Sequence, residues 1–232
     1  GPHAGYRVNV RNKGPAYGLV GPRGDEQLYA SRGHTLVSDG ARRRGHGRNH
    51  MEYVALLRGI NVGGNNKVVM SELREQVAAE GFANVRTYIN SGNLLFEAEA
   101  DAPCEDVAQT VEDTLARRYD FPIRLALLAG QDYLAELHNL PDWWHGAVAR
   151  RDVLFYTRGL DRGHVRERIE AMELGDEAVY FGEHAVFWGK FDEKNFLNTA
   201  YHRRLLREDF YRQVTIRSGS TVEKIASLLA RD

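Results

Sequence analysis

Cysteine and long apolar runs are what this 232-residue sequence most plainly lacks. Its one cysteine, Cys104, cannot form an internal disulfide or build a multi-cysteine metal site, and such a lone thiol is most often a small buried apolar residue. No run approaches the roughly 18 apolar residues that cross a bilayer. The N-terminus also lacks the charged-then-apolar form of a signal peptide. These absences predict a cytoplasmic protein that does not enter a membrane.

A large excess of charge is also absent, since the formal net charge is −1. The charge is unevenly distributed, however. Residues 1–50 contain nine Arg or Lys and three acidic residues, whereas residues 51–232 contain 22 basic and 29 acidic residues. Nonspecific attraction to nucleic acid or to an anionic membrane needs a basic surface. The acidic body therefore argues against nucleic acid as a partner, and we expect no membrane partner.

Motifs for metals and cofactors are missing as well. The histidines His138, His164, His184 and His202 lack the i, i+4 spacing of a helical metal pair, and no further cysteine could join them. The sequence contains no P-loop, no dinucleotide fingerprint and no nucleophile elbow. We therefore expect no metal and no cofactor. Whether the protein is an enzyme stays open, because catalytic groups can assemble from distant segments.

Residues 1–50 read unlike the rest of the chain. They are rich in Gly, Arg and His, show no sustained periodicity, and open with Gly-Pro-His, which resembles the scar of a cleaved tag. Met51 stands directly before the first convincing strand. We therefore predict a tag-like or disordered N-terminal extension over 1–50, of which the short piece "YRVNV" could add a strand to a sheet edge.

From Met51 onward the patterns follow the order β-α-β-β-α-β-α over residues 51–141, and after a linker at 142–151 the same order returns over 152–232. This is the ferredoxin-like arrangement, a four-stranded antiparallel sheet with two helices on one face. We predict an α+β protein whose two ferredoxin-like halves form one pseudo-symmetric body. Each half must hide an open sheet face, so a cleft between the halves is the expected ligand site.

The periodicities also predict the individual elements. In the first half they are a strand at 53–59, a helix at 70–82, a hairpin at 85–100, a helix at 104–119, a strand at 122–130 and a helix at 131–140. In the second half they are a strand at 152–160, a helix at 163–175, a hairpin at 178–191, a helix at 195–208, a strand at 212–218 and a helix at 221–232. In the first helix, Leu73, Val77 and Ala78 should face the core, and Gly81 should end it.

The stretch "LRGINVGGNNK" that follows the first strand has the composition of an anion-binding loop. Its three glycines, Gly59, Gly63 and Gly64, let backbone N–H groups approach a ligand, and a nest of such groups beside a helix N-terminus favours phosphate or carboxylate. Asn61 would orient the ligand, and Arg58 and Lys67 would add charge. The alternative is a tight turn that satisfies its own backbone, with Ser71 as the cap of the following helix.

The segment "YVALLRGINVGGNNKVVMSELREQVAAEGFANVRTYINSGNLLFE" resembles the N-terminal signature of the bacterial domain-of-unknown-function family 1697. The resemblance covers about residues 51–230. It implies two ferredoxin-like halves and no established activity. The positions that it carries over are Arg58, Gly59, Asn61, Gly63, Gly64, Lys67, Ser91, Gly92 and Asn93.

A second small loop, "RSGST", precedes the last helix. The family resembled here usually shows Arg-Asn-x-x-Thr-Val at this place, so Arg217 and Thr221 are kept while Ser218 replaces asparagine. Ser220 or Thr221 should cap the helix. If pseudo-symmetry brings this loop to the first one, the two would share a polar pocket. The first strands of the halves also match, since "LLRG" and "YTRG" place Arg58 and Arg158 at equivalent strand ends.

Taken together, these patterns favour a protein that binds a small anionic or phosphorylated ligand at the loop 58–67. The predicted ligand-binding residues are Arg58, Gly59, Asn61, Gly63, Gly64, Lys67, Ser91, Asn93, Arg217 and Thr221. One alternative is an enzyme acting on such a ligand in the cleft between the halves, for which His145 and His184 are the candidate titratable residues.

Another alternative is a nucleic-acid or protein interaction module that uses an open sheet face at residues 153–156 and 185–191, where aromatic residues gather. The adjacent Trp143 and Trp144 are expected to plug the junction between the halves rather than to stack on a ligand.

Overall fold

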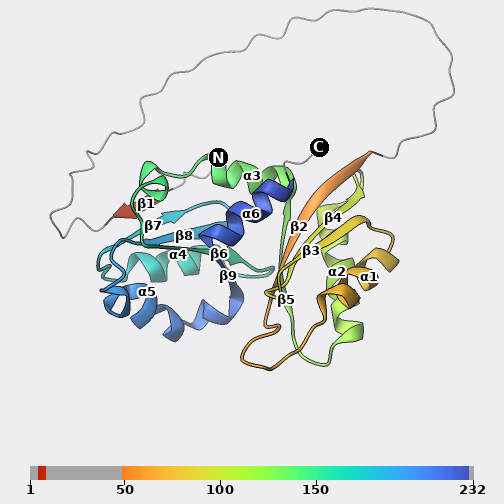
Figure 1. Cartoon of the computed structure of the whole chain (residues 1–232), viewed down its shortest axis with the longest axis horizontal. Helices are drawn as coiled ribbons and strands as arrows, with labels where there is room; N and C mark the ends of the chain where they lie inside the picture. Colours follow the sequence, from red (N-terminus) through yellow and green to blue (C-terminus); the bar gives the residue numbers. More distant parts are fainter. Residues whose placement is uncertain (1–4, 9–48, 230–232) are drawn as a thin grey trace, which may run out of the picture.

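The computed structural model describes residues 5–8 and 49–229; predictions that concern residues 1–4, 9–48 or 230–232 lie outside this part of the chain. The described chain forms two antiparallel sheets with helices packed on them (Figure 1). The predicted mixture of helices and antiparallel strands is therefore confirmed. Within the described residues, each helix is too short or too polar to cross a bilayer.

Every predicted element of the first half is present. Leu73 and Val77 are buried on the first helix as predicted, but Ala78 is exposed, because each residue of a helix is rotated by about 100° from the one before it. Gly81 follows the helix with a φ of +96°, a conformation that glycine adopts without strain. The elements are β2 (His50–Arg58), α1 (Met70–Ala79), β3 (Ala83–Tyr88), β4 (Asn93–Glu99), α2 (Cys104–Arg118), β5 (Arg124–Ala129) and α3 (Gly130–His138).

The second half repeats this order after a short 3-10 helix, η1 (Asp142–His145). Its elements are β6 (Arg150–Tyr156), α4 (Arg162–Glu170), β7 (Glu177–Phe181), β8 (Ala185–Lys190), η2 (Phe196–Asn198), α5 (Ala200–Arg203), η3 (Leu205–Arg207), η4 (Asp209–Gln213), β9 (Val214–Ser218) and α6 (Gly219–Leu229).

The prediction of one continuous helix at 195–208 is wrong. The segment is divided into η2, α5 and η3, because polar side chains bind the backbone N–H groups that a continuous helix would use. The Thr199 hydroxyl accepts from His202 N at 3.2 Å. The buried Glu177 carboxylate accepts from Ala200 N at 2.8 Å and from Tyr201 N at 2.9 Å.

An additional strand, β1 (Gly5–Val8), comes from the segment predicted as an N-terminal extension. It pairs antiparallel with β7, so that Gly5 lies opposite Phe181 and Val8 lies opposite Ala178. The expectation that "YRVNV" could add a strand to a sheet edge is confirmed for residues 5–8. In Figure 1, β1 lies beside β7, on the side of the molecule opposite to the start of β2.

The strand order is the same in the two halves once β1 is set aside. The first sheet runs β3-β4-β2-β5, and the second runs β1-β7-β8-β6-β9. In each half the first strand in sequence is therefore central, with the third strand on one side and the fourth on the other. This order leaves β3 and β5 at the edges of the first sheet and β9 at one edge of the second.

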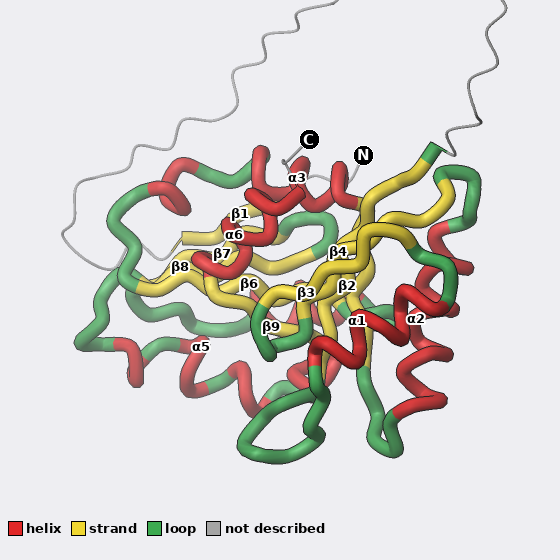
Figure 2. Tube along the Cα trace, turned by 45° about the vertical axis from the view of Figure 1, so that its right-hand side comes forward, coloured by secondary structure: helices red, strands yellow, loops and turns green. Residues whose placement is uncertain are grey.

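Three apolar clusters make up the core. One lies between the first sheet and its helices α1 and α2, and includes Leu73, Phe96 and Val111. A second lies on the face of the other sheet that α4 and α5 cover, and includes Val165 and Trp188. The third joins the halves, because it combines residues of both sheets with residues of α3 and α6. Figure 2 shows α3 and α6 together where the two sheets meet.

The third cluster shows how the open sheet faces are covered. Trp143 and Trp144 belong to it, and Trp144 meets Phe187 of β8 edge to face with ring centroids 5.3 Å apart. The tryptophans thus plug the junction as predicted. The open aromatic face predicted at 153–156 and 185–191 is wrong, because residues 153–156 and 185–190 are all buried.

The lone thiol of Cys104 is exposed rather than buried, since it begins α2 at the surface.

Candidate functional site

The glycine pair of the predicted anion loop forms the tip of a small hairpin. Asn65 N donates to Val62 O at 2.9 Å, and Asn61 N donates to Asn66 O at 3.0 Å. Gly63 and Gly64 have φ values of +57° and +79°, which are those of a two-residue hairpin turn with both central residues left-handed. The tip is exposed. The positive φ values that the turn requires are enough to explain the presence of the two glycines.

Asn61 closes the base of this hairpin. Its side-chain amide donates to Val68 O at 3.0 Å and to Asn90 O at 2.9 Å, while its side-chain oxygen accepts from Val68 N at 2.8 Å. Asn66 donates in the same way to Gly59 O at 2.9 Å. The Asn61 side chain therefore fastens the hairpin to the turn between β3 and β4, instead of pointing free groups at a ligand.

Arg58 reaches across to the second half. Its Nε donates to Val214 O at 2.7 Å and its Nη2 to Tyr211 O at 3.2 Å, with the guanidinium 5.5 Å from the centre of the Tyr211 ring. Burial lowers the pKa of Arg58, opposed by Tyr211 and assisted by the nearby cations Arg212 and Arg124. Arg58 therefore links the two halves through its hydrogen bonds.

Arg217 makes the complementary connection from β9 to the first half. Its Nε donates to Asn93 Oδ1 at 2.7 Å, and its Nη2 donates to Leu57 O at 2.8 Å and Ser91 O at 2.9 Å. Only 5% of Arg217 is exposed, and burial lowers its pKa to about 10. Arg58 and Arg217 both lie at the junction of the halves, where their guanidinium groups donate to backbone carbonyls and, for Arg217, also to the side-chain oxygens of Asn93 and Thr215.

Helix caps differ from the prediction in both loops. The cap position of α1 is Val69, which makes no side-chain hydrogen bond, so Ser71 is not the cap. The hydroxyl of Ser218 accepts from Thr221 N at 3.4 Å, so Ser218 caps α6 instead of Ser220 or Thr221. Serine and asparagine are both strong N-cap residues. The replacement of asparagine by Ser218 therefore keeps the capping role.

Of the predicted ligand-binding residues, those with exposed positions are Gly63, Gly64 and Lys67. Asn93 is fully buried and donates to Tyr88 O at 2.9 Å. The ligand-binding role of the loop stays a prediction, with most of its polar side chains already engaged within the protein.

A cleft of about 510 Å³ opens beside β5, with lining residues from both halves. We call it the junction cleft. The C-terminal end of α2 and the segment leading into β5 form most of its wall, and one residue of the second half completes it. Its lining residues are Glu112, Leu115, Ala116, Tyr119, Asp120, Phe121, Pro122, Ile123, Arg124, Leu125 and Arg158.

The two arginines of the junction cleft differ in how they are neutralised. Arg158 forms ion pairs with Glu105 and, at 2.7 Å, with Glu112. Arg124 donates from Nε to Thr157 Oγ1 at 2.8 Å and from Nη2 to Arg158 O at 3.1 Å. Among the described residues no salt bridge involves Arg124. Arg124 therefore brings an uncompensated positive charge to the cleft.

The sequence patterns do not indicate Arg124 as a site residue, because its position depends on strand register. In the structure Arg124 lies opposite Arg58 on the neighbouring strand. Two arginines side by side on adjacent strands repel each other unless an anion or a polar partner lies near. His145 and His184 do not line the cleft.

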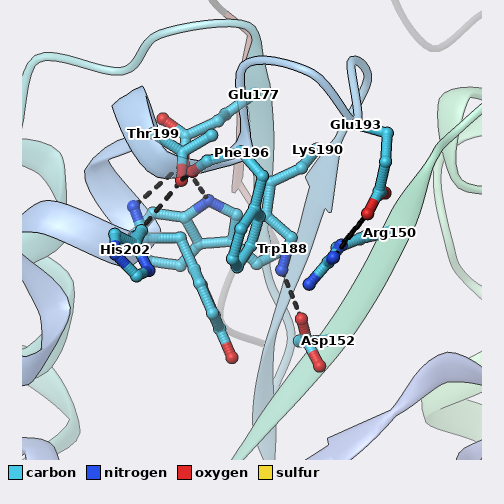
Figure 3. Close-up of polar contacts among 10 residues, drawn as sticks. Arg150, Asp152, Glu177, Trp188, Lys190, Glu193, Phe196, Thr199 and His202 are labelled. Atoms are coloured by element: carbon cyan, nitrogen blue, oxygen red, sulfur yellow. Dashed lines mark hydrogen bonds and ion pairs between the residues drawn. The ribbon is translucent and has the colours of Figure 1, made fainter.

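A second polar cluster lies beneath α5 in the second half (Figure 3). Lys190 pairs with Asp152, and its ammonium lies 3.5 Å from the centre of the Tyr201 ring. Burial lowers the pKa of Lys190, opposed by Asp152. Glu177 accepts from Trp188 Nε1 at 3.0 Å in the same region. Because the Lys190 side chain is only 1% exposed, this cluster serves packing and is closed to a substrate.

The described residues contain no group of three or more His, Cys, Asp or Glu side chains that could hold a metal ion.

Comparison with known proteins gives a family and a structural relative. Residues 51–187 match the sequence model of a family described as "Protein of unknown function (DUF1697)". A solved structure, described as "The structure of conserved bacterial protein SP0830 from Streptococcus pneumoniae", is 45% identical with a TM-score of 0.74. That match covers 78% of this chain and 99% of the pneumococcal chain. No curated protein matches the chain.

Proposed function

Because the chain belongs to the DUF1697 family, whose description assigns no activity, we propose a function from its geometry: it binds a small organic anion in the junction cleft. The observation that carries this proposal is Arg124, which lines the cleft and makes no salt bridge within the described part of the chain. A guanidinium in such a position recognises carboxylate or phosphate groups.

The charge around the cleft supports an anion over a cation. Glu112 is already paired with Arg158, and Arg58 lies close enough to Arg124 for the two cations to affect each other. Asp120 is exposed at the rim and is the one acidic lining residue without an ion pair among the described salt bridges. The Asp120 carboxylate would repel an anionic ligand. Removing this charge by mutation therefore tests whether the ligand is an anion.

The apolar wall suggests the shape of the ligand. Leu115, Phe121 and Ile123 line the cleft together with Tyr119, whose ring lies 5.6 Å from that of Phe121. A cleft of about 510 Å³ is within the range of pockets that hold small molecules. We therefore expect an anion with an aromatic or apolar body, such as a nucleotide or an aromatic carboxylate.

Binding is favoured over catalysis in the same cleft. Burial raises the pKa of Tyr119, so its phenol stays protonated at neutral pH and can donate but not accept a proton as a base. Glu112 forms an ion pair with Arg158, and Arg124 donates to Thr157 Oγ1 and to Arg158 O. These polar contacts are those of groups that hold a ligand in place.

The test is a thermal-shift screen against nucleotides, sugar phosphates, aromatic carboxylates and short oligonucleotides. Wild type should shift with one anionic class, since a ligand at a hundredfold excess over Kd adds about 2.7 kcal/mol to stability. Arg124→Gln should lose the shift. Arg166→Gln, which removes a partly exposed arginine paired with Glu170 on α4, should keep it. Equal shifts in both variants, or none in wild type, would overturn the proposal.

The role predicted for the loop 58–67 is tested separately by Lys67→Gln, because Lys67 is exposed and lies outside the junction cleft. Loss of the shift in this variant alone would move the anion site to the hairpin.

We also infer that each half is ferredoxin-like and that the halves arose by duplication. The strand orders β3-β4-β2-β5 and β7-β8-β6-β9, which place corresponding strands identically, support this. The natural division is then 51–141 and 152–232 around a linker at 142–151. A cytoplasmic location is supported by the single cysteine.

A further inference from the structure

The edge of β7 is built to accept a strand. β7 pairs with β8 along its whole length on one side and with β1 on the other. Without β1, the outer N–H and C=O groups of β7 would form an unpaired edge, which is a template for another extended segment. This edge lies in the second half, apart from the junction cleft, so the inference below does not depend on the proposed ligand.

The edge is also held rigid. The hairpin turn between β7 and β8 is fixed by Glu136 of α3, whose carboxylate accepts from His184 N at 2.7 Å, Ala185 N at 3.1 Å and Glu183 N at 3.2 Å. With β1 in place, all residues of β7 are buried. A strand that docks on this edge meets a hairpin whose turn is already ordered, which lowers the entropy cost of docking.

The segment that fills the edge is joined to the body by a long stretch of chain. Residues 9–49 separate β1 from β2, a stretch that could span up to about 140 Å when fully extended. In general, a tether between two binding segments gives an effective concentration of about 1 mM when it is short and flexible, and a lower one when it is longer. A second copy at a comparable concentration can therefore compete for the same edge.

We propose that the β7 edge is a strand-docking site and that residues 5–8 of a second copy of this chain dock on it, exchanging β1 between two molecules. The four-residue register seen within one chain, with Tyr6 opposite Tyr180 and Arg7 opposite Val179, is kept between chains. In such an exchange the β1–β7 pairing within one chain is replaced by an identical pairing between two chains. The free-energy cost is therefore low, and the two copies are joined reciprocally.

The experiment uses disulfide capture between two full-length chains that both carry Cys104→Ser. One carries Val8→Cys and the other Ala178→Cys, because these residues are opposite each other in the register. Mixed near 0.5 mM under mild oxidation, the two should form a covalent heterodimer. The matched control replaces Ala178→Cys by Ser71→Cys, an exposed position on α1, and should give at least fivefold less heterodimer.

A second variant shows whether strand pairing causes the capture. Tyr6→Pro with Arg7→Pro removes two consecutive N–H groups, one of which must face β7 because neighbouring residues of a strand point to opposite sides. Added to the Val8→Cys chain, these prolines should abolish the excess heterodimer. A yield equal to that of the Ser71→Cys control, or one that the prolines leave unchanged, would overturn the proposal. If Ala178→Cys does not fold, Arg7→Cys with Val179→Cys uses the adjacent register pair.

Discussion

The guanidinium of Arg217 lies among oxygen atoms of the first half, and within the described part of the chain no carboxylate is among its hydrogen-bond partners. Its planar fork reaches Asn93 and two backbone carbonyls at once, which a lysine ammonium cannot reproduce. Such an arginine behaves as part of the core. Arg124 has fewer partners, since it donates to Thr157 Oγ1 and to Arg158 O, and the proposed anion site rests on this difference.

Loss of Arg217 should therefore destabilise the protein strongly. Arg217→Ala leaves buried acceptors without donors and should lower the free energy of unfolding by about 3–5 kcal/mol. Chemical denaturation measures this, with Arg212→Ala as control, because Arg212 is exposed and should change stability by about 0.5 kcal/mol or less. A similar small effect for Arg217→Ala would show that the junction is held by apolar packing alone.

The Lys190–Asp152 pair predicts which of its two residues costs more stability when it is replaced. Asp152→Asn leaves a buried ammonium without its counter-charge and should cost about 3–5 kcal/mol, whereas Lys190→Met leaves an aspartate whose side chain is 22% exposed to water. We expect Asp152→Asn to be the more damaging change in urea unfolding. The reverse order would mean that the ammonium reaches solvent.

His164 and Asp209 form a surface pair with a pH signature. The Asp209 carboxylate accepts a hydrogen bond from protonated His164 Nε2 at 2.8 Å, which raises the pKa of His164 and lowers the pKa of Asp209. A raised histidine pKa gives stability that is lost as pH rises through the folded value, and a lowered aspartate pKa gives stability that is lost as pH falls.

The pair should therefore stabilise the fold mainly between about pH 4 and pH 7, given ordinary values of about 3.9 and 6.5. NMR titration of His164 should give a pKa above 6.5 that falls in Asp209→Asn. An unchanged titration would place the cause of the shift elsewhere.

At the scale of elements, the turn between β3 and β4 carries visible strain. Ile89 has a φ of +49° and is 48% exposed, although a branched side chain disfavours the left-handed region. Asn61 ties the next residue of this turn to the hairpin, which explains how the conformation is held.

Replacing Ile89 should relieve that strain. Ile89→Asn should raise the melting temperature, with a gain of about 0.5–1 kcal/mol, because asparagine tolerates the left-handed region. Leu197→Asn is the control, since Leu197 is exposed but is not among the described residues with positive φ. An equal effect of both changes would indicate a general benefit of surface polarity.

Sequence patterns predicted most elements because their apolar periods are strong, as in α2 and β2. They failed at 195–208, where the helix is broken by Glu177, a residue distant in sequence that binds the backbone of α5. They also missed Ser218 as the cap, because a cap depends on where the helix begins, and that boundary moved from Thr221 to Gly219. Long-range polar contacts are invisible to local patterns.

At the scale of the whole molecule, pattern repetition predicted two halves but not how they meet. The predicted open face is filled by α3, α6 and the paired tryptophans, an outcome that depends on three-dimensional packing. The candidate site shows the same limit. Arg58 and Arg217 were predicted as ligand-binding residues, whereas in the structure both donate to carbonyl groups of the other half, which a sequence pattern does not locate.

The most direct test of the anion site uses calorimetry. It measures the Kd of the anion selected by the screen for two single variants of the junction cleft. Asp120→Asn removes an exposed negative charge and should lower Kd by about twofold to fivefold, since an exposed charge contributes up to about 1 kcal/mol. Arg124→Gln should raise Kd at least tenfold. If the two variants bind as wild type does, or if Asp120→Asn weakens binding, the junction cleft is not an anion site.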